Sequence, residues 1–456
     1  MTNSQTKIAL QYFRDHQDAL FKEMIKFLSI PSVSTDEAHK NDIQGAAGFL
    51  VKKLVEIGFD QVEAFPTAGH PIVYAEKNVD PQKPVILLYG HYDVQPPDPI
   101  DLWDYPPFEP SVDGDYVFAR GASDMKGQIW AAISALDSIL SSDDLSVNIK
   151  FLIEGEEEIG SPSLEGFLSE NKRMLACDMV LNPDAGMLGP DKPTIVYALR
   201  GLAYFELRVY GPQADLHSGV FGGVVDNPAN VLSRVIAGMH DSHQRVTLPG
   251  FYDQVRTLTE EEHLQLSKIG MDETFFKSIT GVPALGGDPN FTPIERVGAR
   301  PTLDVNGLYA GYTDPGAKTI IPAYAMAKIS TRLVPDQNPD EIHRCLQAYL
   351  EENMPQTVRW ELDYLSGAPA YIADKEAPGV DQFIEALHQT WGVQPLMKRE
   401  GGSIPVATSM KKHLGVDSII TGFGLPDDRI HSPNERMHLP THRKGVEALI
   451  RFFNSF

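Results

Sequence analysis

The sequence has only two cysteines among its 456 residues, Cys177 and Cys345, and no CxxC pair. Because the two are far apart, neither a disulfide framework nor a thiolate zinc site is predicted. No stretch approaches the apolar length that spans a membrane, and the first residues lack the basic-then-apolar order of a secretory signal. These absences predict a cytoplasmic protein with no membrane contact.

Basic residues are also scarce, with 39 Lys and Arg against 62 Asp and Glu and a formal net charge of −23. Such a chain repels nucleic-acid phosphates and anionic lipid headgroups, so we expect neither as a partner. Carboxylates that bind cations count as negative in this tally although the folded site neutralises them. The charge therefore gives weak support for metal binding.

The chain is too long for one compact core, so two domains are expected. Through the first 200 residues, apolar runs alternate with helical patterns; the runs are "PVILLYG", "SVNIKFLIEG" and "CDMVLNPD". Runs that are apolar at successive positions are typical of strands covered on both faces. The pattern predicts an α/β fold, in which a mixed, mostly parallel sheet carries helices on both faces and one helix begins at Asp124.

From about Ala203 the order changes to β-α-β-β-α-β, with helical patterns at 227–240 and 339–353. That order predicts a ferredoxin-like α+β domain, a four-stranded sheet with two helices on one face. The first pattern then returns. We therefore expect one domain made of residues 1–204 and 367–456, interrupted by an inserted domain of residues 205–366.

Polar side chains follow three of the apolar runs. His91 and Asp93 follow the first, Glu156, Glu157 and Glu158 the second, and Asp184 ends the third. A hydrogen-bonded histidine at a strand end and a turn aspartate would each explain one of these residues alone. Ligands of open α/β sheets, however, bind outside the carboxyl ends of the strands, where all three groups fall.

Two further segments carry candidate side chains. Asp124 in "ARGASDMKG" could be a helix N-cap or a metal ligand, and His431 in "HSPNE" could be an exposed loop histidine or a ligand. In "REGGSIPV", Gly401, Gly402 and Ser403 are expected to open a helix and to offer backbone donors to an anion or a carbonyl oxygen.

Taken together, "GHYDVQP", "ARGASDMKG", "EGEEEIGS", "LNPD", "DLHSGVFGG", "STRLVP", "REGGSIPV" and "HSPNE" resemble the M20 family of metallopeptidases, in its carnosinase-like and cytosolic nonspecific dipeptidase branch. The resemblance spans nearly the whole chain in the right order. It implies a zinc-aminopeptidase-like catalytic domain, and an inserted domain that acts as a lid and joins two copies in a homodimer.

The resemblance also implies two divalent cations per subunit, zinc first, with Mn²⁺ or Co²⁺ as alternatives. Asp124 would bridge them, Glu158 and His431 would complete one ion, and His91 and Asp184 the other. Asp93 would orient His91, and Glu157 would be the general base. A slip of one position, to Glu156 and Glu157, would reassign these two roles. The family also tends to carry a cis peptide after its bridging aspartate, here Asp124-Met125.

For the substrate, the resemblance implies that Arg332 grips a free carboxylate, with Thr319, Gly402 and Ser403 beside it, while His217 from the partner subunit stabilises the oxyanion. The implied function is metal-dependent hydrolysis of dipeptides or very short peptides with a free C-terminal carboxylate. Two alternatives stay open: removal of acyl or succinyl groups at the same two-metal site, and a noncatalytic binding protein of this fold.

Overall fold

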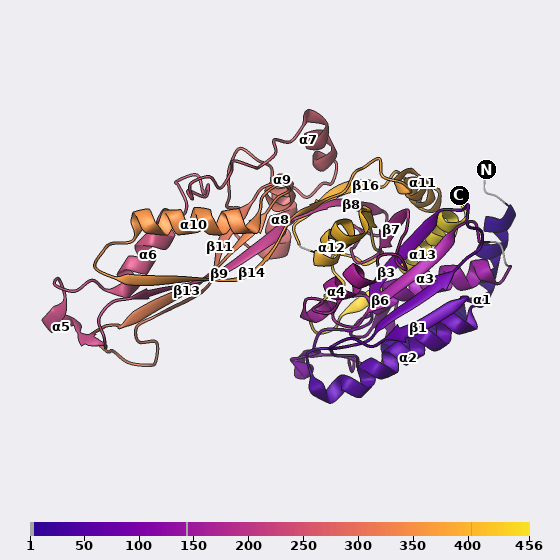
Figure 1. Cartoon of the computed structure of the whole chain (residues 1–456), viewed down its shortest axis with the longest axis horizontal. Coiled ribbons are helices and arrows are strands. Elements are labelled where there is room, and N and C mark those ends of the chain that lie inside the picture. Colours follow the sequence, from indigo (N-terminus) through magenta and orange to yellow (C-terminus); the bar gives the residue numbers. More distant parts are fainter. Residues whose placement is uncertain (1–3, 143–144, 403) are drawn as a thin grey trace. The chain divides into compact units, whose positions relative to one another are not determined.

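The computed structural model describes residues 4–142, 145–402 and 404–456, which form two compact units. The first unit contains Met1–Tyr197, Ala373–Met397 and Val406–Phe456, and the second Ala198–Ile372 and Lys398–Pro405. Figure 1 shows the elements of both units along the chain. No helix in the described ranges is both long and apolar enough to cross a membrane.

The first unit is built on a mixed sheet with the strand order β1-β2-β6-β3-β7-β17-β8. The β3 strand pairs in parallel with β6 and β7, and β17 pairs in parallel with β7, whereas β1, β2 and β8 run antiparallel to their neighbours. The strands are β1 Gln61–Phe65, β2 Ile72–Lys77, β3 Val85–His91, β6 Asn148–Glu154, β7 Met179–Asn182, β8 Thr194–Leu199 and β17 Ser418–Ile420.

The strands β6 and β7 are buried at every position, and β3 is buried at all but its first. Burial of successive positions indicates that helices cover both faces of this sheet. The predicted α/β class is therefore confirmed. The helices are α1 Ser4–Leu28, α2 Lys40–Glu56, α3 Lys126–Leu140, α4 Leu164–Glu170, α11 Val380–Trp391, α12 Pro405–Leu414 and α13 Leu439–Phe453. Three short strands, β4 Ser111–Asp113, β5 Tyr116–Phe118 and β18 Arg436–His438, form a separate small sheet.

The second unit contains the predicted four-stranded sheet, with the order β11-β13-β9-β14 and antiparallel pairing throughout. Its strands are β9 Gly201–Tyr210, β11 Thr302–Ala310, β13 Tyr324–Leu333 and β14 Arg359–Ala368, and its two long helices are α6 Pro228–Gly238 and α10 Pro339–Asn353. The smaller elements are β10 Leu216–His217, α5 Ser218–Phe221, α7 Glu260–Ser267, α8 Glu273–Thr280, α9 Pro293–Gly298, β12 Ile320–Ile321, β15 Tyr371–Ile372 and β16 Leu396–Glu400, the last of which begins in the first unit.

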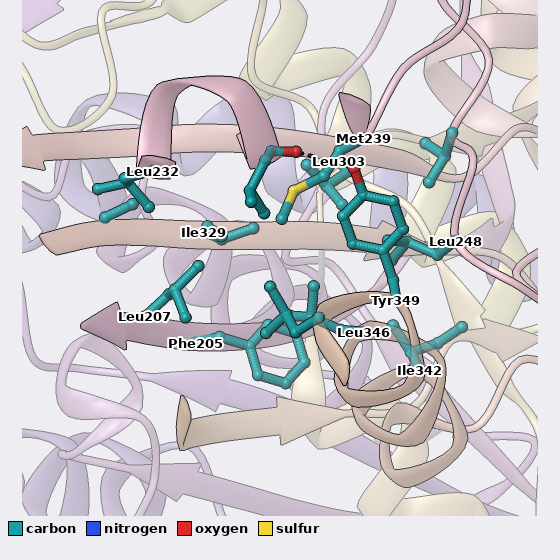
Figure 2. Close-up of a cluster of buried hydrophobic side chains, with 14 of the residues drawn as sticks. Phe205, Leu207, Leu232, Met239, Leu248, Leu303, Ile329, Ile342, Leu346 and Tyr349 are labelled. Carbon is teal, nitrogen blue, oxygen red and sulfur yellow. Dashed lines mark hydrogen bonds between the residues drawn. The ribbon is translucent and has the colours of Figure 1, made fainter. Parts of the chain in front are cut away.

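One face of the four-stranded sheet is the core of the second unit. Burial alternates along β9 with the period of two that a strand gives its side chains, so that Phe205 and Leu207 point inward. Figure 2 shows these two side chains packed with Leu232 of α6 and Leu346 of α10. The hydroxyl of Tyr349 donates a hydrogen bond of 2.9 Å to the carbonyl of Val235, which ties the two helices together.

Candidate metal centre

The carboxyl ends of β3, β6 and β7 deliver polar side chains to one edge of the first unit's sheet. His91 is the last residue of β3 and lies opposite Glu154, the last residue of β6. After Glu154 the chain leaves the sheet and forms a single 3-10 turn, Glu157–Ile159, closed by Gly160 at φ 86°. Asp184 follows β7 by two residues. The glutamates can therefore face a site that a regular strand would have denied to two neighbouring residues.

The structure brings all five predicted ligands together. His91, Asp124 and Asp184 place their ligand atoms within 4.8 Å of one another, and so do Asp124, Glu158 and His431. His91 Nε2 lies 3.2 Å from Asp124 Oδ1 and 3.7 Å from Asp184 Oδ1. Asp124 is thus common to both groups.

The second group uses the other oxygen of Asp124. His431 Nε2 lies 2.9 Å from Asp124 Oδ2 and 3.3 Å from Glu158 Oε2. Within the described part of the chain, the buried Glu158 Oε1 has no hydrogen-bond partner. A buried carboxylate oxygen without a donor is costly in a protein but suits a metal ligand. The residues present therefore fit a pair of cations bridged by Asp124.

Asp93 supports this arrangement in two ways. Its backbone carbonyl lies 3.1 Å from His91 Nδ1, which favours a proton on that nitrogen and leaves Nε2 free for a metal. Its carboxylate, 3.5 Å from the same Nδ1, accepts hydrogen bonds from the backbone N–H groups of Glu157 (3.2 Å) and Glu158 (3.0 Å). Asp93 therefore orients the histidine and also holds the glutamate turn, a second task that the sequence did not suggest.

The three consecutive glutamates face different surroundings. Both oxygens of Glu156 accept hydrogen bonds from backbone N–H groups, of His70 at 2.9 Å and of Ser163 at 3.0 Å, so this side chain is engaged in local structure. Glu158 belongs to the second ligand group. Glu157 stands between these two in the sequence, and its carboxyl group interacts electrostatically with His91 and Asp184.

Burial and neighbouring charges shift the pKa values of the site's side chains when no cation is bound. Burial raises the pKa of Glu157 to about 8, with Asp184 and Glu158 acting in the same direction against His91. Hydrogen bonds with Asp124 and Glu158 raise the pKa of His431 to about 10. Burial works against a charged His91, yet its contacts with Asp124 and Asp184 raise its pKa well above the ordinary value. The carboxylates of the site outnumber its two imidazoles, so the site favours added positive charge.

Two residues beside the ligand groups, and one in the second unit, were missed in the sequence. Gln95 Nε2 donates a hydrogen bond of 2.8 Å to Glu158 Oε2. The buried Glu435 accepts hydrogen bonds from the loop that ends in Asp124. In the second unit, Arg200 lies beside Gly401 and Gly402 and donates to both of their carbonyls. Gln95 and Glu435 had a local signal, since they stand in the "GHYDVQP" and "HSPNE" motifs, whereas Arg200 lies outside the quoted motifs.

The predicted substrate residues that the structure describes lie in the second unit, at two different ends of it. His217 on β10 pairs with Ile320 on β12, and the carbonyl of Thr319 accepts a hydrogen bond from Ser218. Arg332 lies at the far end of β13, eight residues from its first residue, and at about 3.4 Å per residue this separates it from Tyr324 by about 27 Å. One chain alone therefore does not bring Arg332 together with His217 and Thr319.

Arg332 does lie near the glycine segment. Burial, with the charge of Arg332 next, lowers the pKa of Arg200 to about 10, and Arg200 in turn binds the carbonyls of Gly401 and Gly402. Ser403 is outside the described residues. The helix expected to open at 401–403 begins at Pro405 instead, as α12.

An open α/β sheet that collects two histidines and several carboxylates beyond its strand ends is typical of a metal-dependent hydrolase. A family model described as Peptidase family M20/M25/M40 matches residues 87–455. The chain belongs to this peptidase family and is a metallopeptidase.

The proteins similar to this chain match it over nearly its whole length. The Cys-Gly metallodipeptidase of Schizosaccharomyces pombe is 31% identical over 453 residues, covering 96% of this chain and 95% of its own. The human Beta-Ala-His dipeptidase is 31% identical, with 97% and 91% covered. A solved M20 family metallo-carboxypeptidase from Sulfolobus solfataricus is 34% identical at a TM-score of 0.85, with 95% and 98% covered, and human carnosine dipeptidase 1 is 28% identical at 0.83, with 100% and 99% covered.

Proposed function

We propose that this enzyme hydrolyses dipeptides with a free C-terminal carboxylate at a centre for two divalent cations. The observation that carries the proposal is the sharing of Asp124 between two ligand groups, one oxygen to each. The named relatives support the substrate class, because they are dipeptidases. The metallo-carboxypeptidase also fits, since a carboxypeptidase by definition acts next to a C-terminal carboxylate.

In this proposal His91, Asp124 and Asp184 would hold one ion and Asp124, Glu158 and His431 the other, so that Asp124 would be shared by both. Bound there, two cations would lower the pKa of a water towards neutrality and polarise the scissile carbonyl. Oxygen and nitrogen ligands without sulfur suit zinc, which we expect first, and also Mn²⁺ or Co²⁺.

Glu157 is the general base of this mechanism. Nearby cations favour its ionised form, in opposition to the burial that raises its pKa to about 8 in their absence. The carboxylate takes a proton from the attacking water as the oxygen adds to the carbonyl carbon. It then passes that proton to the leaving amine nitrogen as the C–N bond breaks.

We further propose that a homodimer completes the site. Arg332, next to the segment that contains Gly402 and Ser403, would bind the substrate carboxylate, the bidentate task for which arginine is suited. The partner subunit's His217 would stabilise the oxyanion, and the partner subunit's Thr319 would come with it. The support is the separation of these two groups along β13 within one chain.

A dipeptide panel with and without chelator tests the central proposal. Metal-replete enzyme is expected to hydrolyse Cys-Gly, β-Ala-His and related dipeptides, to lose this activity with chelator, and to regain it with Zn²⁺ or Mn²⁺. N-acyl and N-succinyl amino acids are included in the panel, although the named relatives do not favour them. Turnover of acyl compounds alone would reject the dipeptidase assignment, and no turnover by metal-loaded enzyme would support a noncatalytic protein.

Glu157→Ala tests the base. We expect hydrolysis to fall by about 10²-fold or more while the metal content stays at the wild-type level, because Glu157 is not a ligand. Glu170→Ala, on the exposed end of α4, is the matched control and should keep full activity. Unchanged turnover in Glu157→Ala would reject this role.

Subunit mixing tests the homodimer. Glu157→Ala and His217→Ala chains are each expected to be inactive, whereas co-expression should restore about a quarter of wild-type activity through randomly paired dimers with one complete site. If His217 acted within its own chain, no mixture could assemble a complete site. The cytoplasmic location stays a prediction from the sequence, which cell fractionation would test.

A further inference from the structure

The carboxylate of Glu435 is fully buried and is surrounded by four donors from one loop. Its Oε2 accepts from the Arg120 guanidinium and from the backbone N–H of Gly121 at 3.1 Å. Its Oε1 accepts from the N–H groups of Ser123 and Asp124, both at 3.0 Å. Every donor belongs to the five residues that end in Asp124, so one side chain fixes the path of that loop.

Glu435 also lies four residues after His431, so it joins the segments that deliver two facing ligands. Further hydrogen bonds join the same segments. Ser123 Oγ donates to Asp428 Oδ2 at 2.8 Å, and the N–H of Ala119 donates to the carbonyl of Glu435 at 3.1 Å. The backbone of His431 adopts φ 57°, a conformation that residues other than glycine adopt only where the surrounding structure holds it.

We propose that Glu435 is the positioning residue of the metal centre, which holds Asp124 at the correct distance from His431 before any cation arrives. The inference rests on the metal centre proposed above. A carboxylate is needed because each of its oxygens accepts two N–H donors, and an amide of the same shape would turn an NH₂ group towards two of them. Outer residues that orient metal ligands typically contribute about 10- to 100-fold to metal affinity or activity.

Glu435→Gln tests this proposal through zinc affinity, measured on the full chain by competition with a chromophoric chelator. We expect the dissociation constant to rise by about 10- to 100-fold, since the ligands lose their preset spacing. Glu295→Gln is the matched control. Glu295 is a buried carboxylate of the second unit that accepts from the N–H of Thr292 at 2.8 Å and belongs to neither ligand group.

Unfolding of both metal-free variants separates positioning from general loss of stability. The proposal expects similar losses of stability, with weaker zinc binding in Glu435→Gln alone. Wild-type zinc affinity in Glu435→Gln, or an equal loss in Glu295→Gln, would overturn it. If Glu435→Gln does not fold, Arg120→Met removes one donor from the same carboxylate and should weaken zinc binding by about tenfold; unchanged affinity there would also overturn the proposal. A wild-type chain that binds no zinc would refute the proposed function itself.

Discussion

Mild acid should destabilise the first unit through one buried histidine, His442. This residue lies on α13, is 7% exposed, and has its Nε2 3.1 Å from the carbonyl of Gly127 on α3. Burial lowers the pKa of His442 to about 4, with Arg443 contributing in the same direction against the Gly127 hydrogen bond. The folded protein therefore keeps this imidazole neutral where an unfolded chain would protonate it.

The sign and size of the effect follow from proton linkage. In the unfolded chain the histidine titrates near 6.5, so its contribution to stability is complete above that pH and is lost as the pH falls towards about 4. At 1.36 kcal/mol per pKa unit, the separation corresponds to about 3 kcal/mol in all, of which about 2 kcal/mol should be gone by pH 5.

Urea unfolding of chelator-treated protein at pH 7.5 and pH 5, followed by circular dichroism, measures this loss. His442→Gln keeps a donor for the Gly127 carbonyl but does not titrate, so it should lose about 2 kcal/mol less than the wild type between the two pH values. His243→Gln, at an exposed turn, is the matched control. The reasoning is refuted if His442→Gln keeps the full pH dependence of the wild type.

Three further predictions concern packing and charge. Leu346→Ala opens a cavity in the core of the second unit and should cost about 2–5 kcal/mol in calorimetry; an unchanged melting temperature would contradict this role of Leu346. Contacts with Lys412 and His413 lower the pKa of Glu165 to about 2, so the stability that they contribute should be lost as the pH falls from 4.5 towards 2. Because Gln does not titrate, the melting temperature of Glu165→Gln should fall less than that of the wild type between pH 5 and 3. A Cβ at Gly422 would clash with the carbonyl oxygen of Ala185, next to Asp184, so Gly422→Ala should weaken zinc binding about tenfold in chelator competition; wild-type affinity would contradict this prediction.

Strand ends in this chain were predictable because apolar runs and the polar residues after them are local features. The runs ending at Gly155 and Asp184 contain β6 and β7, and the run ending at Gly90 covers β3 except for its last residue, His91. The β-α-β-β-α-β order of the inserted region is confirmed as β9, α6, β11, β13, α10 and β14. Periodicity and strand-end position depend only on neighbouring residues, which a sequence displays directly.

The features that the sequence did not predict include some that depend on contacts between segments far apart in the chain. The helix expected from Asp124 begins at Lys126, and the N–H of Asp124 is engaged by Glu435, 311 positions away. The Asp124-Met125 peptide is cis, as the family resemblance implied. The short helices α7, α8 and α9 were also missed, because each has at most eight residues and too few turns to show a clear apolar stripe.

Anomalous diffraction from crystals of the zinc-loaded enzyme tests the central claim most directly. Two peaks per chain are predicted, one between His91, Asp124 and Asp184 and the other between Asp124, Glu158 and His431. A single peak, or a peak coordinated by Glu157 in place of Glu158, would contradict the account.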